Sequence, residues 1–286
     1  MAKLPNFASP IQFIRYICLS MIIFINVVES NEVNDLREQA MEGDLEAQAA
    51  LGRKYFYGEG VSKSEKEALY WYLKAAENGH PKGQYSAGIM LMHGIGVERD
   101  DAKGLDWLTV AAIQGLDLAQ YNLGVAYRDG SRLVKSDLEA AKWFKRASDQ
   151  GLIQAKLNLG NLYLNGAGVE QDDEKAFQLF KDSAGQGMVE ADANLGLAYL
   201  YGWGVGRNKW QAIHWLRKAS DQGDLQAQVE VSRYLFLDYE WLDDWILFWI
   251  ADPGRSVAFN IGDKIGKSLI FIGLPYFFYR RIQKGK

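Results

Sequence analysis

A spacing of 36 residues recurs along most of this chain and constrains its fold more than any other feature. Two series of glycines and one series of large apolar residues share it. The first series is Gly52, Gly88, Gly124, Gly160 and Gly196; the second is Gly43, Gly79, Gly115, Gly151, Gly187 and Gly223; the third is Trp71, Trp107, Trp143, Leu179 and Trp215. Three series with one period and no insertions predict a repeat protein.

Each repeat predicts a pair of helices. In the fourth unit Ala155, Leu159 and Tyr163 lie four residues apart, which places them on one face of a first helix. Gly166 suits the left-handed C-terminal cap of that helix. The second helix is predicted to begin after an N-capping residue at a fixed position: Ser64, Asp100, Ser136, Asp172 and Asn208. In three units a residue three positions later completes the pattern of a capping box: Glu67, Glu139 and Gln211.

No single helix hairpin buries both of its faces, so the copies are expected to stack into an all-α solenoid. The pattern A-x-x-x-L-G-x-x-Y-x-x-G-x-G-V, followed by a capping residue, K-A, W and K-A-A-x-x-G, resembles the Sel1-like repeat, a relative of the tetratricopeptide repeat, over about residues 47–226. The resemblance implies a right-handed α/α solenoid that works as a non-catalytic adaptor between proteins, often in secretory or cell-envelope settings. The second unit departs from the pattern at Leu91 and Gly104, and the third has Gly130-Ser131-Arg132-Leu133 in place of G-x-G-V.

The sequence before the repeats predicts export. Residues 1–30 combine Lys3 and Arg15 with an apolar stretch of 13 residues from Tyr16 to Val28. Thirteen helical residues span about 20 Å, less than the ~30 Å of a bilayer core. A cleaved signal peptide is therefore favoured over an N-terminal anchor, the alternative. Residues 31–46 are expected to form a capping half repeat, and residues 47–234 the solenoid of five units plus a partial sixth.

Residues 235–286 differ in composition from the repeats. The first part, to residue 250, mixes aromatic with acidic residues and predicts an amphipathic helix capping the last repeat. A second apolar run, Ser268 to Tyr279, is followed by Arg280, Arg281, Lys284 and Lys286. Aromatic residues beside basic ones are typical of a membrane interface. Membrane contact by this hydrophobic tail and packing under the last repeat both remain open.

The sequence offers no catalytic, metal or cofactor site. His80, His93 and His214 fall at different points of the repeat without ligand spacing, and the single cysteine, Cys18, cannot join them. They are expected to be plain surface or packing residues. No nucleophile is paired with a base, so an exported hydrolase is the weakest alternative. The net charge of −4 and the lack of a basic stripe along the repeats argue against nucleic acid as a partner.

A partner-binding surface is the better hypothesis. In the related tetratricopeptide repeats, one side of the first helix lines a concave groove. The corresponding residues here are Arg53, Tyr57, Tyr85, Tyr121, Asn122, Leu157, Asn158, Asn161, Asn165, Asn194 and Tyr201. Asn122, Asn158 and Asn194 form a ladder that could hold the backbone of an extended peptide or protein partner. Alternatively, these asparagines bond the loops of adjacent repeats.

Together these features predict an adaptor of the periplasm, cell envelope or secretory pathway. The rival hypothesis is a membrane-tethered structural subunit of an envelope complex that acts through the tail.

Overall fold

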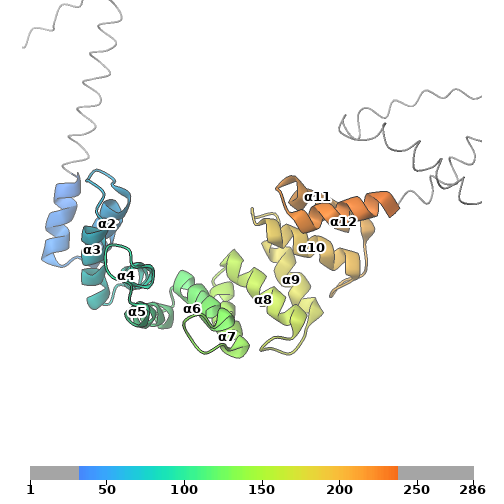
Figure 1. Ribbon diagram of the computed structural model, residues 1–286, viewed down its shortest axis with the longest axis horizontal. Helices are drawn as coiled ribbons and strands as arrows, with labels where there is room; N and C mark the ends of the chain where they lie inside the picture. Colours follow the sequence, from blue (N-terminus) through green and yellow to red (C-terminus); the bar gives the residue numbers. More distant parts are fainter. Residues whose placement is uncertain (1–31, 238–286) are drawn as a thin grey trace, which may run out of the picture. The chain divides into compact units, whose positions relative to one another are not determined.

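The computed structural model describes residues 32–237, which form helices joined by short loops (Figure 1). A helix over residues 32–42 is followed by α2 (Leu45–Tyr57), α3 (Glu65–Glu77), α4 (Pro81–His93), α5 (Asp101–Ile113), α6 (Asp117–Asp129), α7 (Asp137–Asp149), α8 (Ile153–Asn165), α9 (Asp173–Ser183), α10 (Val189–Tyr201), α11 (Lys209–Asp221) and α12 (Leu225–Leu237). The predicted all-α solenoid is confirmed. The predicted export signal lies outside the described residues, as does the tail beyond residue 237.

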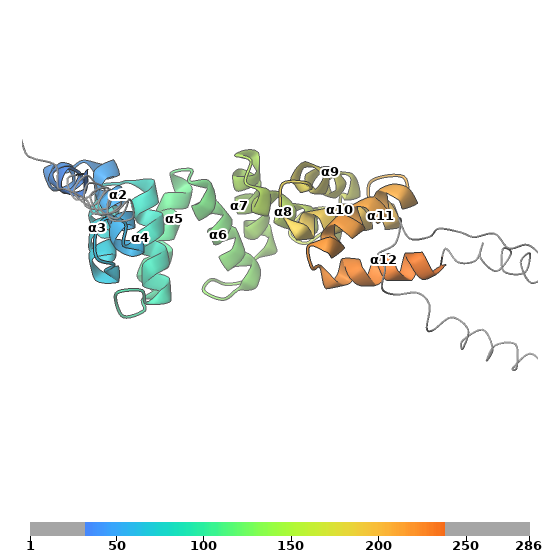
Figure 2. The same ribbon diagram turned by 90° about the horizontal axis from the view of Figure 1, so that it is seen from above.

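The helices form hairpins that follow one another in sequence order (Figures 1 and 2). From α2 to α11 each helix packs against the next, and α2 also contacts α4. We call α2, α4, α6, α8 and α10 the A helices of units 1 to 5, and α3, α5, α7, α9 and α11 their B helices. Within residues 32–237, no helix has the length and apolar content needed to cross a bilayer.

The B helices begin where the sequence predicts. The five predicted N-cap side chains each accept a hydrogen bond from the backbone N–H three residues later. The second hydrogen bond of the predicted capping box, from the N-cap backbone N–H to the side chain three residues later, does not form. The backbone N–H of Ser64 donates to the carbonyl of Tyr55 at 2.9 Å, and the other four caps repeat this bond to the A helix of their own unit. The group that Glu67 was expected to satisfy is therefore already bonded.

The loop between the two helices of a unit also touches the preceding unit. Gly168 has φ +71°, and a Cβ placed on it would overlap the backbone of Asp137, at the start of α7. Gly96 and Gly204 lie in the same way against the units before them. The third unit has Arg132 at this position, and its Nε donates to the Asp101 carboxylate at 2.9 Å. An ion pair therefore replaces the glycine contact where the sequence departs from the repeat pattern.

The first glycine series receives a large side chain from the B helix. A Cβ on Gly160 would lie 2.7 Å from the ring of Phe180, and Gly124 meets Phe144 in the same way. The equivalent residues in all five units are Tyr72, Leu108, Phe144, Phe180 and Leu216, each buried. They follow directly after the tryptophan series. The tryptophan position instead reaches an adjacent hydrophobic cluster, as Trp107 and Trp143 do.

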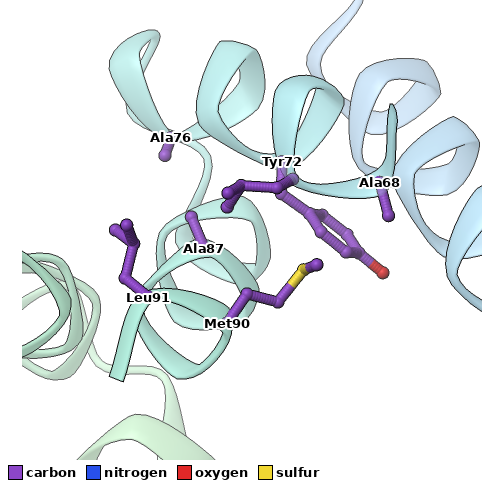
Figure 3. Close-up of a cluster of buried hydrophobic side chains, with 7 residues drawn as sticks. Ala68, Tyr72, Ala76, Ala87, Met90 and Leu91 are labelled. Carbon is purple, nitrogen blue, oxygen red and sulfur yellow. The ribbon is translucent and has the colours of Figure 1, made fainter. Parts of the chain in front are cut away.

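Unit 2 adapts this packing at its two departures from the pattern. Gly104 replaces the usual alanine, and a Cβ on Gly88 would lie 2.8 Å from the Gly104 carbonyl oxygen. The backbones of α4 and α5 therefore approach closely, and Leu108 stands where units 1, 3 and 4 have an aromatic ring. Between α3 and α4, Tyr72 and Met90 point toward one another in a cluster that includes Leu91 (Figure 3). Burial raises the pKa of Tyr72 to about 12.

A buried glutamine ties successive units together. Gln120 in α6 donates to the carbonyl of Ala112 at the end of α5, at 3.1 Å. Its own oxygen accepts a hydrogen bond from Gln150, after α7, at 2.8 Å. Gln84 makes the same two kinds of contact, with Ala76 and Gln114. One amide therefore joins three helices of two units.

Three junctions depart from this arrangement, and at the one between units 3 and 4 the equivalent residue is Lys156. Gln48 donates to Ala40, but its Oε1 atom is buried without a hydrogen-bond partner. Between units 4 and 5 the equivalent residue is Asp192, which is fully buried. Its carboxylate accepts from the backbone N–H of Gly185 at 2.7 Å and lies 3.1 Å from Lys218. Gly185 has φ +79°, and α9 ends at Ser183 with 11 residues, where the other B helices have 13.

Candidate functional site

The predicted partner-binding residues lie on the A helices of all five units. None of the ten polar or aromatic members is buried: Arg53, Tyr57, Tyr85, Tyr121, Asn122, Asn158, Asn161, Asn165, Asn194 and Tyr201. Leu157, placed in the set by the same helical projection, is an exception with 6% exposure, because it packs in the cluster with Phe180 and Leu195. Its inclusion was wrong. We call the remaining ten residues the A-helix face.

The asparagine ladder joins neighbouring A helices. Asn122 donates to the Tyr85 hydroxyl at 3.2 Å, and Asn194 donates to the Asn161 side chain at 3.0 Å. The oxygen of Asn158 accepts a hydrogen bond from Arg128. Each asparagine therefore bonds the preceding unit, as in the alternative hypothesis, but through side chains of its A helix rather than through a loop. This arrangement leaves the amides fixed in position at a half-exposed surface.

Arg128 is a residue that the sequence reasoning missed at this face. It lies in the last turn of α6 and bonds both Asn158 and the Asp129 carboxylate, the latter at 2.7 Å. Asp129 holds the guanidinium pKa above its usual value. The equivalent residues of the other units are all apolar: Phe56, Met92, Leu164 and Leu200. Arg128 is the one charged residue among these five equivalent positions, and this was the signal that could have identified it.

The tyrosines of the A-helix face differ in how far they are exposed. Tyr57 is 65% exposed at the end of α2, and Tyr201 is 40% exposed and stacks on Trp203 with ring centroids 5.4 Å apart. Tyr85 is half-buried, and its burial raises the pKa of its hydroxyl, which therefore stays protonated at physiological pH. Tyr57 offers the largest apolar area to a partner.

The histidines fall into different settings. His80 is buried and caps α4: its Nδ1 accepts from the backbone N–H of Gly83 at 3.1 Å, and its Nε2 lies 3.0 Å from Glu46. The hydrogen bond from His80 lowers the pKa of Glu46. His93 and His214 are exposed. In the part of the chain that the structure describes, no three histidine, cysteine or acidic side chains gather where they could hold a metal ion.

A hollow of about 350 Å³ lies between α7 and α8 and is lined by none of the ten residues of the A-helix face. Its lining combines an apolar floor with a charged rim: Leu138, Ala141, Lys142, Lys145, Arg146, Asp149, Leu159, Tyr163 and Val169. Sequence reasoning did not find it. The available signal was one position of the repeat that holds a small residue in the third unit alone: Leu69, Leu105, Ala141, Phe177 and Ile213.

Comparison with known proteins identifies the repeats. The Sel1 repeat profile matches residues 45–80, 81–116, 117–152, 153–188 and 189–224. Among curated proteins, none matches the sequence.

Two of the solved structures that are similar to the chain support the same family. One is c5321, described as a protective antigen present in uropathogenic Escherichia coli strains that displays an SLR fold; it is 34% identical with a TM-score of 0.68, over 72% of this chain and 44% of that one. The chain thus spans less than half the length of c5321. A Sel1 repeat protein from Oxalobacter formigenes is 30% identical with a TM-score of 0.61, over 70% of this chain and 87% of that one. With five matched repeats and these structural relatives, the chain belongs to the Sel1 repeat family.

Proposed function

We propose that the protein is a non-catalytic adaptor of the cell envelope or secretory pathway, which binds a partner protein or an extended peptide along the A-helix face. The observation that carries this proposal is the exposure of that face. Ten polar and aromatic side chains, from every one of the five units, remain at least partly accessible, whereas the residues on the other side of the same helices form the core.

The chemistry of the face suits a peptide backbone. The amides of Asn122 and Asn194 are held by neighbouring side chains, so binding costs little additional side-chain entropy. Tyr57 and Tyr201 add aromatic area in the first and the last unit, and such residues commonly supply much of the binding energy at interfaces. Spaced contacts along a solenoid favour an extended partner.

Export is the second part of the proposal. It is supported by the basic and apolar stretches within residues 1–30. The similarity to a protein described as a protective antigen also fits a chain that leaves the cytoplasm. Fusing alkaline phosphatase after residue 237, before the hydrophobic tail, tests this part, because the enzyme is active only where its disulfides form. An inactive fusion, or activity that persists after deletion of residues 1–30, would contradict it.

Site-specific photo-crosslinking in the native cell tests the binding face. A photoreactive amino acid at Tyr57 should give a discrete heavier band, identified by mass spectrometry as one partner. The matched control is Ile113, which is similarly exposed at 69% but lies at the end of a B helix. The same band from Ile113, or no band from either Tyr57 or Tyr201, would contradict the assignment of the partner to the A-helix face.

A further inference from the structure

The hollow between α7 and α8 exists because one repeat lacks a side chain that the others have. In unit 4, Phe177 packs edge-on against Tyr199 of the next A helix, with ring centroids 5.3 Å apart. Leu69 likewise belongs to one cluster with Leu91 of the next A helix. The third unit places Ala141 opposite Tyr163 instead. Ala141 itself is 3% exposed, and the hollow lies beside it.

The rim of this hollow carries three cations and one carboxylate, that of Asp149. Lys142, Lys145 and Arg146 extend from the exposed side of α7 beside Ala141. No other unit combines a small residue at the position equivalent to Ala141 with three cations at the positions equivalent to Lys142, Lys145 and Arg146. The equivalent triplets are Tyr70, Leu73 and Lys74 in unit 1, Asp106, Thr109 and Val110 in unit 2, Gln178, Lys181 and Asp182 in unit 4, and His214, Arg217 and Lys218 in unit 5.

The three cations are available to a ligand. Lys142 pairs with Glu139 at 2.6 Å and Lys145 with Asp149 at 2.9 Å, but all four side chains are more than a third exposed, and such surface pairs exchange partners at little cost. Arg146 stacks over the ring of Trp143 at 4.4 Å and has no carboxylate partner among the described residues. A guanidinium held in this way can bind a carboxylate through two parallel hydrogen bonds, that is, in a bidentate manner.

We propose that this hollow binds an acidic peptide segment that inserts one large apolar side chain over Ala141. The apolar floor of Leu159, Tyr163 and Val169 would cover that side chain, and its flanking carboxylates would contact Lys145 and Arg146. Charge complementarity selects this occupant: Arg146 has no carboxylate partner among the described residues, and an acidic peptide would supply one. The site shares no residue with the A-helix face and does not depend on the proposed function.

A labelled peptide provides a direct test with the full-length protein. The probe is a fluorescein-tagged Asp-Glu-Phe-Glu-Asp peptide, and its binding is followed by fluorescence anisotropy. Replacing its phenylalanine with alanine should weaken binding about tenfold or more, because the hollow then stays empty. Equal binding of the two peptides would overturn the proposal by showing that charge alone is recognised.

Protein variants locate the site. Ala141→Leu installs the residue found in units 1 and 2 and should reduce affinity about tenfold while leaving the circular dichroism spectrum unchanged. Ala102→Leu makes the same change at an exposed position of α5 and should have no effect. Lys145→Glu should also weaken binding, which keeps the proposal falsifiable if Ala141→Leu does not fold. Full affinity in both folded variants would overturn the proposal, and so would a change of oligomeric state in Ala141→Leu, which would assign the hollow to a second copy of the chain.

Discussion

The junction between units 2 and 3 and the junction between units 4 and 5 fill the same buried position with different chemistry. At the first, the neutral side chain of Gln120 donates to a carbonyl and accepts from Gln150. At the second, the carboxylate of Asp192 only accepts, from Gly185, Lys218 and Gln222. We call them the neutral and the ionic junction.

The difference shows that side chains of different hydrogen-bonding chemistry can fill this position. A carboxylate cannot donate to the carbonyl at the end of the preceding B helix, as glutamine does. The ionic junction instead shortens α9 and turns a backbone N–H, that of Gly185, toward Asp192. Lys218 stays 38% exposed, so only one member of the ion pair loses its water completely.

The largest effect is expected at the ionic junction. Asp192→Ala should lower the free energy of unfolding by about 3 kcal/mol, because it leaves the Gly185 N–H without an acceptor and removes the partner of Lys218. Urea unfolding followed by circular dichroism measures this loss. Asp149→Ala, which removes an exposed carboxylate, is the control and should change stability little. Similar losses in the two variants would show that Asp192 has no special role.

A smaller loss is expected at the neutral junction. Gln120→Ala removes one hydrogen bond to the Ala112 carbonyl and one from the Gln150 amide, although each group keeps a second bond to Gly115, and should cost about 1.5 kcal/mol. Hydrogen exchange should be accelerated in α5, α6 and α7, the helices that meet there. Gln154→Ala, at an exposed position of α8, serves as the control. A loss equal to that of Asp192→Ala would contradict the distinction between the two junctions.

The stability of the junction before unit 1, where Gln48 lies, can be increased. The Oε1 atom of Gln48 has no hydrogen-bond partner. In units 2 and 3 the equivalent atom accepts from Gln114 or Gln150. The corresponding residue of unit 1 is Asn78, which is one methylene shorter than glutamine. Asn78→Gln should therefore raise the free energy of unfolding by about 1 kcal/mol, as measured by urea unfolding. The gain should vanish in a Gln48→Leu background, and a gain that persists there would assign it to another cause.

The smallest effect concerns salt. Raising sodium chloride from about 0.05 M to about 0.5 M should weaken the partly exposed pair of Asp192 and Lys218 by a few tenths of a kcal/mol. Asp192→Asn should lose this component of the salt response, whereas Gln120→Ala should keep it. Urea midpoints of the three proteins at both salt concentrations give the comparison. Identical salt responses in wild type and Asp192→Asn would contradict an ionic contribution.

The sequence was sufficient for the features that repeat without change. The N-caps such as Ser64 and the helix-ending glycines such as Gly166 lie where predicted, because each satisfies a local backbone requirement. The contact of Phe180 with Gly160 was missed, since Leu179 and Phe180 are both apolar and a period alone does not say which one faces the glycine. The hollow at Ala141 depends on what one unit lacks, which a search for shared residues overlooks.

The ion pair of Arg132 with Asp101 also bears on how such arrays are rebuilt by duplication. A copy of unit 3 carries an arginine that needs an acid at the start of the preceding B helix. Glu65, Asp101, Asp137 and Asp173 provide one in the first four units, but unit 5 has Lys209 there. The third unit could therefore be inserted behind any of the first four units and keep its contact, whereas behind the fifth it would meet a like charge.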